Sequence, residues 1–171
     1  MVSWETIIGA MGARGQPSAK ADSAVSDLES HVGFWLRFVS NHVSGAFGRL
    51  IEAQGLTVSE WVALRRLLST GPSTAGALVD ALGMTKGAVT KVIDRLVAKR
   101  LVARTLDPND GRVQRVALTR AGRALVPKLA ALADENDAHF FGHLSAKERK
   151  VLIDILRGVV RRHGLTRLPT E

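Results

Sequence analysis

Basic side chains are concentrated between residues 86 and 123, in a stretch that could hold a polyanion. Ten lysines and arginines lie there against three acids: Lys86, Lys91, Arg95, Lys99, Arg100, Arg104, Arg112, Arg115, Arg120 and Arg123 against Asp94, Asp107 and Asp110. This excess of seven supplies most of the chain's formal net charge of +8. Such a cluster is typical of surfaces that bind nucleic acid, although a run of charge also fits a solvated face.

Small and hydroxyl-bearing residues stand beside the first of these cations, at the start of an expected helix. The candidates for contact with base edges are Thr85, Lys86, Gly87 and Thr90. Side chains at the exposed start of a helix in the major groove reach the bases, and the free amides there favour phosphate. Gly87 carries no side chain and permits close approach of the backbone. Lys91 and Arg95 follow one turn apart, a spacing that suits backbone phosphate.

The elements that must position these residues are two short helices joined by a glycine turn. Leu78 and Leu82 precede Gly83, and Val89 follows six residues later. Buried aliphatic residues on both sides of such a turn are typical of a helix-turn-helix, whose second helix enters the major groove. The hydroxyls expected to cap the two helices are those of Ser73 or Thr74 and of Thr85.

The apolar pattern changes to alternation after residue 100 and predicts a β-hairpin. Residues 101–105 and 112–118 are expected to form two strands, with turn-forming residues at 107–111 between them. A hairpin that directly follows a helix-turn-helix is a wing. Asp94 and Asp110 are expected to hold basic wing residues in place, because phosphate repels a carboxylate.

Two longer amphipathic helices are expected to flank this unit. Apolar residues at steps of three and four run from Val25 to Ile51 and predict one long helix that ends near Gly55. A last helix is expected to open with a capping box of Ser145 and Glu148. The first apolar stripe exceeds what a local core can cover, so we expect part of it to pack against another chain.

Shorter helices complete the prediction. A capping box of Thr57 and Glu60 opens a helix that Gly71 closes. Thr119 is expected to cap a helix after the wing, in which Pro127 would cause a kink or a late start.

The predicted fold is mainly α with a small β-hairpin wing, a winged helix-turn-helix with N- and C-terminal dimerisation helices. Residues 1–24 are expected to form a flexible tail. Residues 25–55 and 120–164 are expected to form the helical dimerisation region, and residues 56–119 the winged helix-turn-helix that binds DNA.

Four consecutive motifs run from residue 84 to residue 122. They are the helix segment Met84–Leu96, the strand entry Arg100–Arg104, the turn Asp107-Pro108-Asn109-Asp110-Gly111-Arg112 and the closing Leu118-Thr119-Arg120-Ala121-Gly122. Together they resemble the MarR family of bacterial transcription regulators. The chain departs from the family at Arg100, where a glycine is usual, at Val79 in place of alanine, and at Gly111, where a second basic residue is common.

The resemblance implies a homodimer that binds a pseudo-palindromic operator in double-stranded DNA as a repressor, with half-sites about 34 Å apart. Arg112 matches the family arginine that enters the minor groove, whose negative potential favours a guanidinium. Arg115 is expected either to contact DNA or to be a solvated charge, and the same holds for Arg104 and Lys99.

The resemblance also implies a small-molecule pocket between the dimerisation helices and the DNA-binding lobe, from which an effector releases the DNA. The candidate residues are His31, Phe34 and Trp35 on the first long helix and Trp61 on the next. A small aromatic or phenolic effector fits these side chains. The alternative is that aromatic residues at helical spacing pack in the core, which we favour for Trp61.

His139 and His143 are four residues apart on an expected helix, a spacing that can bind zinc. With His42 or His31 they could form a metal site, so a metal-responsive regulator of the same fold is an alternative. The competing interpretation is packing at a dimer interface or a partner for the helix dipole. No cofactor is expected, and the chain has no cysteine.

Composition and motifs argue against other classes of protein. Hydrophobic residues make up 46% of the chain, which is enough for a sizeable core. No apolar run spans a bilayer and no secretory signal precedes the first helix, so a cytoplasmic protein without a membrane partner is expected. An enzyme is not expected, because the sequence lacks a phosphate loop, a nucleophile elbow and paired carboxylates. A winged helix that docks another protein is the remaining alternative.

Overall fold

The computed structural model describes residues 25–107 and 110–165. The predicted tail, residues 1–24, and the wing-tip residues Pro108 and Asn109 lie outside the described residues. The elements are, in order, η1 (Leu28–Ser30), α2 (Val32–Glu52), α3 (Val58–Thr70), β1 (Ser73–Thr74), α4 (Ala75–Leu82), α5 (Lys86–Ala98), β2 (Val102–Leu106), β3 (Gln114–Leu118), α6 (Arg120–Phe141) and α7 (Ala146–Arg162). This confirms a mainly helical fold with a small β-hairpin wing. None of the described helices is both long and apolar enough to cross a membrane.

Two compact units, Met1–Val39 and Ser40–Glu171, divide the chain within α2. The prediction of a helix from Val25 is wrong, because the single 3-10 turn η1 precedes α2. Ser30 Oγ donates a hydrogen bond to the Asp27 carbonyl oxygen at 2.6 Å. Such local bonds from short polar side chains compete with helical hydrogen bonds, so the apolar periodicity begins before the helix does.

Side-chain caps start the five helices from α3 to α7, as predicted. A hydroxyl oxygen accepts a hydrogen bond from a first-turn amide at each N-cap: Thr57, Thr74, Thr85, Thr119 and Ser145. The capping boxes completed by Glu60 and Glu148 are both present. Gly83 separates α4 from α5 in the left-handed conformation, at φ +64°. The helix-turn-helix is therefore set by local sequence.

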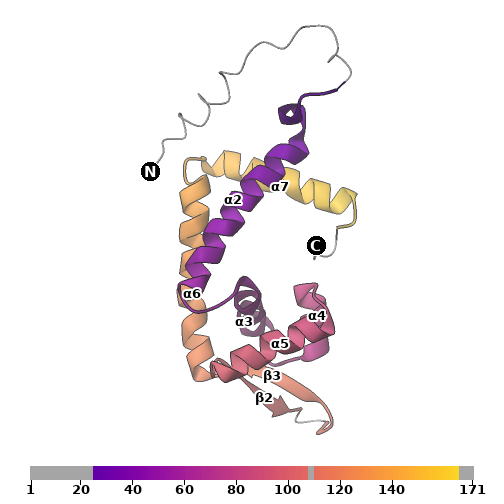
Figure 1. The fold of residues 1–171 in the computed structure, drawn as a ribbon, viewed down its shortest axis with the longest axis vertical. Helices are drawn as coiled ribbons and strands as arrows, with labels where there is room; N and C mark the ends of the chain where they lie inside the picture. The colour runs from indigo at the N-terminus through magenta and orange to yellow at the C-terminus, as the bar shows by residue number, and fades with distance from the viewer. Residues whose placement is uncertain (1–24, 108–109, 166–171) are drawn as a thin grey trace. The chain divides into compact units, whose positions relative to one another are not determined.

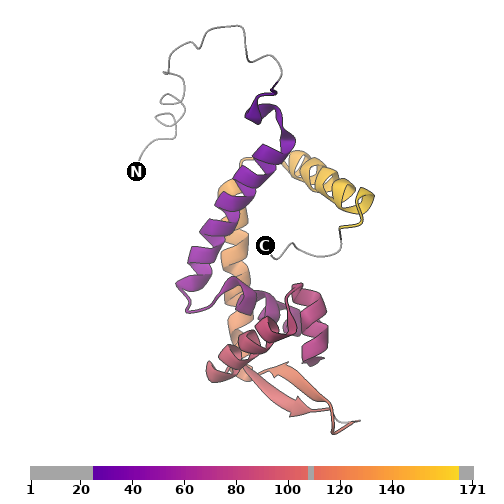
Figure 2. The ribbon, with the colours of Figure 1, turned by 45° about the vertical axis from the view of Figure 1, so that its right-hand side comes forward.

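The wing is an antiparallel hairpin in which Val102 of β2 lies opposite Leu118 of β3. A third strand, β1, pairs with the other edge of β3, so the sheet order is β1-β3-β2. The sequence does not predict β1, because two residues after a proline cannot show alternation. Figures 1 and 2 show the β2–β3 hairpin extending beside α5.

The start of α6 is joined closely to the start of the wing. The Thr119 hydroxyl donates a hydrogen bond to the Arg100 carbonyl oxygen at 2.8 Å, and the Thr119 amide donates one to Leu101 at 3.0 Å. A Cβ at Gly122 would lie 2.1 Å from the Leu101 carbonyl oxygen, so no side chain fits there. Since α6 begins at Arg120, the alternative of a late start caused by its internal proline is wrong.

Arg100 has a φ of +57°, the only positive φ of a non-glycine residue in the described part of the chain. A glycine adopts this left-handed conformation without steric strain, whereas a residue with a Cβ does not. The backbone geometry thus accounts for the glycine that the resemblance leads us to expect where this chain has arginine.

The buried core lies in the second unit, between α3, α4, α5, α6 and the sheet. Its largest fully buried aliphatic side chains are Ile51, Leu64, Leu67, Leu78, Leu96 and Leu129. In contrast, α7 has no buried residue, and all seven of its valines, leucines and isoleucines are exposed. The core thus fixes the winged helix-turn-helix and leaves the apolar face of α7 uncovered.

Candidate nucleic-acid interface

Helix α5 is anchored by one face and presents the other to solvent. Val89, Val92, Ile93 and Leu96 are buried on the anchored face. The predicted base-reading residues Lys86, Gly87 and Thr90 are exposed, as is the N-cap Thr85. The structure therefore brings these four together at the start of α5, where side chains could reach base edges.

Two threonines of this group already make hydrogen bonds to their own helix. Thr85 Oγ1 accepts a hydrogen bond from the Ala88 amide at 3.3 Å, and Thr90 Oγ1 donates one to the Lys86 carbonyl oxygen at 2.9 Å. The Thr90 oxygen can still accept a hydrogen bond, from an adenine or cytosine amino group for instance.

Gly87 faces open space, since a Cβ built on it would meet nothing within 4 Å. The protein's own packing therefore does not require a glycine here. Glycine in a helix costs about 1 kcal/mol relative to alanine, so its presence suits a surface that another molecule approaches closely.

The end of α5 differs from its start because its cations are paired with a buried acid. Glu60 of α3 is completely buried. Its Oε1 accepts a hydrogen bond from Arg95 Nε at 3.1 Å, and its Oε2 accepts one from Lys99 Nζ at 2.7 Å. The Thr57 amide donates a further bond to Oε2 at 2.8 Å. Arg95, predicted to hold phosphate, thus has a partner inside the protein.

Burial raises the pKa of Glu60, but the surrounding donors have a larger opposite effect. Hydrogen bonds from Lys99, the Thr57 amide and Arg95, together with the charge of Lys99, bring the pKa below its ordinary value. Glu60 is therefore a carboxylate at neutral pH, and its two cationic partners stay bound to it.

The wing carries two further ion pairs. Asp94 of α5 binds Arg104 of β2, which ties the helix to the hairpin. Asp107 binds Arg115 of β3. Arg115 also donates a weak hydrogen bond to the Pro72 carbonyl oxygen at 3.4 Å.

Asp110 contacts the backbone at the wing turn, where its Oδ1 accepts a hydrogen bond from the Arg112 amide at 3.0 Å. The Arg112 side chain is exposed, and so are those of Lys86 and Lys91. Among the described residues, none of these three makes an ion pair. The start of α5 and the wing turn thus carry positive charge that no ion pair of the described residues compensates.

Comparison with known proteins identifies relatives of this chain. A family model described as the MarR family matches residues 54–113, from the turn after α2 through the wing turn. The HTH-type transcriptional repressor NicR of Pseudomonas putida is 29% identical over 143 residues, which cover 84% of this chain and 90% of NicR.

Two solved structures share the fold. BpsR of Bordetella bronchiseptica is 31% identical, with a TM-score of 0.69, and the match covers 80% of this chain and 97% of that one. The structure of BpsR concerns the regulation of its DNA binding by 6-hydroxynicotinic acid. A mutant MarR from E. coli complexed with operator DNA is 26% identical, with a TM-score of 0.67 over 79% and 99%.

The chain belongs to the MarR family. Members of this family are DNA-binding transcription regulators with a winged-helix fold.

In this MarR-family chain, three of the four candidate effector residues lie together in the first unit. Phe34 and Trp35 meet edge to face with ring centroids 5.1 Å apart. Trp35 is 47% exposed and donates its indole N–H to the Glu29 carbonyl oxygen at 2.8 Å. His31 Nδ1 lies 3.0 Å from the Asp27 carbonyl oxygen.

Trp61, the fourth candidate, belongs to the second unit and is part of its core. It is buried and packs edge to face on Phe47, with ring centroids 6.3 Å apart. The core interpretation favoured by its helical spacing is therefore confirmed.

The predicted histidine pair does not have the geometry of a metal site. His139 lies on α6, but this helix ends at Phe141, so His143 is not on the same helical face and that expectation is wrong. With Gly142 as the C-cap, the helix ends two residues before His143. Within the described ranges, no group of three His, Cys, Asp or Glu side chains could hold a metal ion.

Two features escape sequence reasoning. Glu60 is predicted only as a capping residue, and capping residues usually lie at the surface. The role of Glu60 as a partner of cations has a signal in the sequence, namely the two cations Arg95 and Lys99 at i and i+4. The other feature is a cavity of about 440 Å³ between the second half of α2 and α6, whose polar lining includes Arg49 and His139. No local pattern predicts that these two helices enclose it.

Proposed function

We propose that this protein is a repressor that reads a pseudo-palindromic operator as a homodimer and is released by a small-molecule effector. The observation that carries the proposal is the set of exposed cations without a salt bridge among the described residues, Lys86 and Lys91 on α5 and Arg112 at the wing turn. In this proposal Thr85, Lys86, Gly87 and Thr90 contact bases, Lys91 holds phosphate and Arg112 enters the minor groove. Asp94 and Asp110 position the wing.

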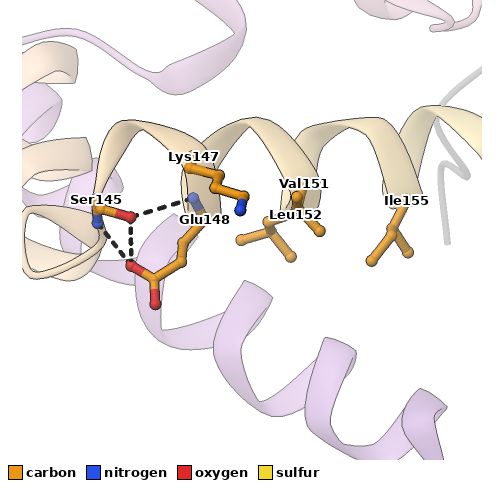
Figure 3. A pocket seen from close by; sticks show the side chains of 6 residues that line it. All are labelled: Ser145, Lys147, Glu148, Val151, Leu152 and Ile155. Carbon is orange, nitrogen blue, oxygen red and sulfur yellow. Dashed lines mark hydrogen bonds between the residues drawn. The ribbon is translucent and has the colours of Figure 1, made fainter.

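Residues 56–119 form the DNA-binding domain in this proposal, and residues 25–55 and 120–164 hold two copies together. The support is the apolar face of α7. Figure 3 shows Val151, Leu152 and Ile155 along one side of this helix, beyond its capping box. They line a cavity of about 540 Å³. Exposed apolar surface of this kind gains stability by packing, and a second copy supplies the matching helix.

The effector is proposed to be a hydroxylated aromatic carboxylate or a phenol. BpsR, to which the chain is similar, is regulated by 6-hydroxynicotinic acid. The aromatic cluster of His31, Phe34 and Trp35 is one candidate site, whereas Trp61, the fourth candidate residue, is part of the core. The cavity beside Arg49 and His139 is another, in which a guanidinium could pair with the carboxylate.

Two measurements test the effector. Titration with 6-hydroxynicotinic acid should quench tryptophan fluorescence and release bound DNA. Loss of DNA release in Arg49→Ala would assign the effector to the cavity. Loss of DNA release in Trp35→Phe would assign it to the aromatic cluster. Saturable quenching with no change in DNA affinity would refute the regulatory part.

The DNA-binding role is tested by sequencing the genomic fragments that the purified protein retains. A shared pseudo-palindromic site is expected, bound with an affinity that falls steeply as salt rises. A protein-docking module would recover no common sequence and show no such dependence. The protein is proposed to act in the cytoplasm by binding, without catalysis.

A further inference from the structure

The buried carboxylate of Glu60 joins the start of α3 to the end of α5. Glu60 lies in the first turn of α3, where its Oε2 accepts a hydrogen bond from the Thr57 amide at 2.8 Å. At the end of α5, Arg95 Nε donates a hydrogen bond to Glu60 Oε1 at 3.1 Å, and Lys99 Nζ donates one to Oε2 at 2.7 Å. Lys99 also donates a hydrogen bond to the Gly55 carbonyl oxygen, at 2.8 Å, in the turn after α2. The end of the recognition helix is therefore tied to α3 and to the turn before it.

The arrangement is asymmetric in solvent exposure. The Glu60 side chain is fully buried, while those of Arg95 and Lys99 are 49% and 36% exposed. The two cations thus reach inward to the carboxylate from the protein surface. If the carboxylate lost its charge, both would be free to turn outward toward any nearby phosphate.

We propose that Glu60 is a positioning residue that sets the specificity of DNA binding, since it orients α5 and withholds Arg95 and Lys99 from non-specific phosphate contacts. Non-specific binding comes from phosphate neutralisation, whereas base reading requires a fixed helix. A single carboxylate therefore favours the operator over other DNA in two ways. This inference rests on the proposed function.

The test compares Glu60→Gln with the wild-type full chain on two duplexes of equal length, one containing the recovered operator and one unrelated. Glutamine keeps the side-chain shape and can still accept the Thr57 amide. Operator affinity should fall on the order of tenfold. Affinity for unrelated DNA should stay the same or rise, with a salt slope steeper by up to about 0.9 for each cation released.

Glu52→Gln is the matched control, because it removes the same charge from an exposed side chain of α2. It should change both affinities by the same small factor. Equal changes on both duplexes in Glu60→Gln would overturn the inference. A wild-type protein that prefers no duplex would instead overturn the proposed function, and the inference with it.

A second pair of variants applies if Glu60→Gln does not fold, as judged by circular dichroism. Lys91→Met removes a cation of α5 that makes no ion pair among the described residues, and Lys99→Met removes the C-cap cation of the same helix, which is bound to Glu60. On unrelated DNA, Lys91→Met should lower the salt slope by about 0.9 per protomer, and Lys99→Met should leave it unchanged. Equal losses of slope would show that Lys99 is not withheld from phosphate.

Discussion

The two ends of α5 both carry lysine or arginine side chains, which are paired with an acid at one end and, among the described residues, unpaired at the other. At its start, Lys86 and Lys91 are exposed and make no ion pair among the described residues. At its end, Arg95 and Lys99 are bound to the buried Glu60. The wing repeats the contrast, since Arg112 at the turn is unpaired while Arg104 and Arg115 on the strands have acidic partners.

The contrast shows that the number of cations in a segment does not by itself identify the residues that contact DNA. A paired cation must give up a hydrogen-bonded carboxylate before it can neutralise phosphate, whereas an unpaired cation gives up only water and counterions. The paired residues are therefore expected to shape the interface, and the unpaired ones to bind the DNA.

The largest effect on operator affinity is expected for Arg112→Ala, with Arg104→Ala as the variant for comparison. Loss of the unpaired Arg112 should weaken operator binding about 10- to 100-fold and lower the salt slope, because a DNA contact is removed. Arg104→Ala should cost less affinity and leave the slope unchanged. Mobility-shift titrations at several salt concentrations measure both. Equal slopes in the two variants would remove the distinction between paired and unpaired cations.

Gly87→Ala separates a functional glycine from a structural one. It should raise the free energy of unfolding by about 0.5–1 kcal/mol, because alanine favours the helix and its Cβ meets nothing. Operator affinity should fall on the order of tenfold if DNA approaches this backbone closely.

Gly45→Ala in the middle of α2 is the control, since its Cβ would meet only the Arg49 side chain at 3.7 Å. It should gain similar stability without losing affinity. If Gly87→Ala binds the operator as the wild type does, the start of α5 is not in close contact with DNA.

The paired end of α5 should respond to acid. The pKa of Glu60 is lowered in the folded state, so its contribution to stability is complete above the unfolded pKa of about 4.3 and is lost as pH falls through the folded pKa. Urea unfolding between about pH 6 and 3 should show a steeper loss of stability for the wild type than for Glu60→Gln. Parallel curves would mean that the ion pairs do not stabilise the fold.

The smallest effect is expected at the junction between α5 and β2. Arg100→Gly relieves the left-handed conformation at φ +57° and should raise the free energy of unfolding by about 1 kcal/mol. Thermal denaturation would detect this as a higher Tm. A lower Tm would mean that the arginine side chain contributes more than its backbone strain costs.

Local rules explain how much of this could be predicted from sequence. The capping hydroxyls of Thr57, Thr85 and Ser145 and the turn at Gly83 act on neighbouring residues, so the sequence predicts the helix starts and the winged helix-turn-helix. The same rules place Lys86, Gly87 and Thr90 at the exposed start of α5.

What could not be predicted depends on distant partners or on where an element ends. Glu60 is 35 residues from Arg95, and only the packing of α3 on α5 brings them together. Strand β1 exists because β3 lies beside it. His143 falls outside α6 since Gly142 ends the helix, which no apolar spacing indicates.

The most direct test of the account is the salt dependence of operator binding when Lys86, Lys91 and Arg112 are all replaced by methionine. The slope of log affinity against log salt should fall by about 0.9 for each charge, hence by about 2.7 per protomer. A slope equal to that of the wild type would contradict the claim that the unpaired cations at the start of α5 and the wing turn bind the DNA.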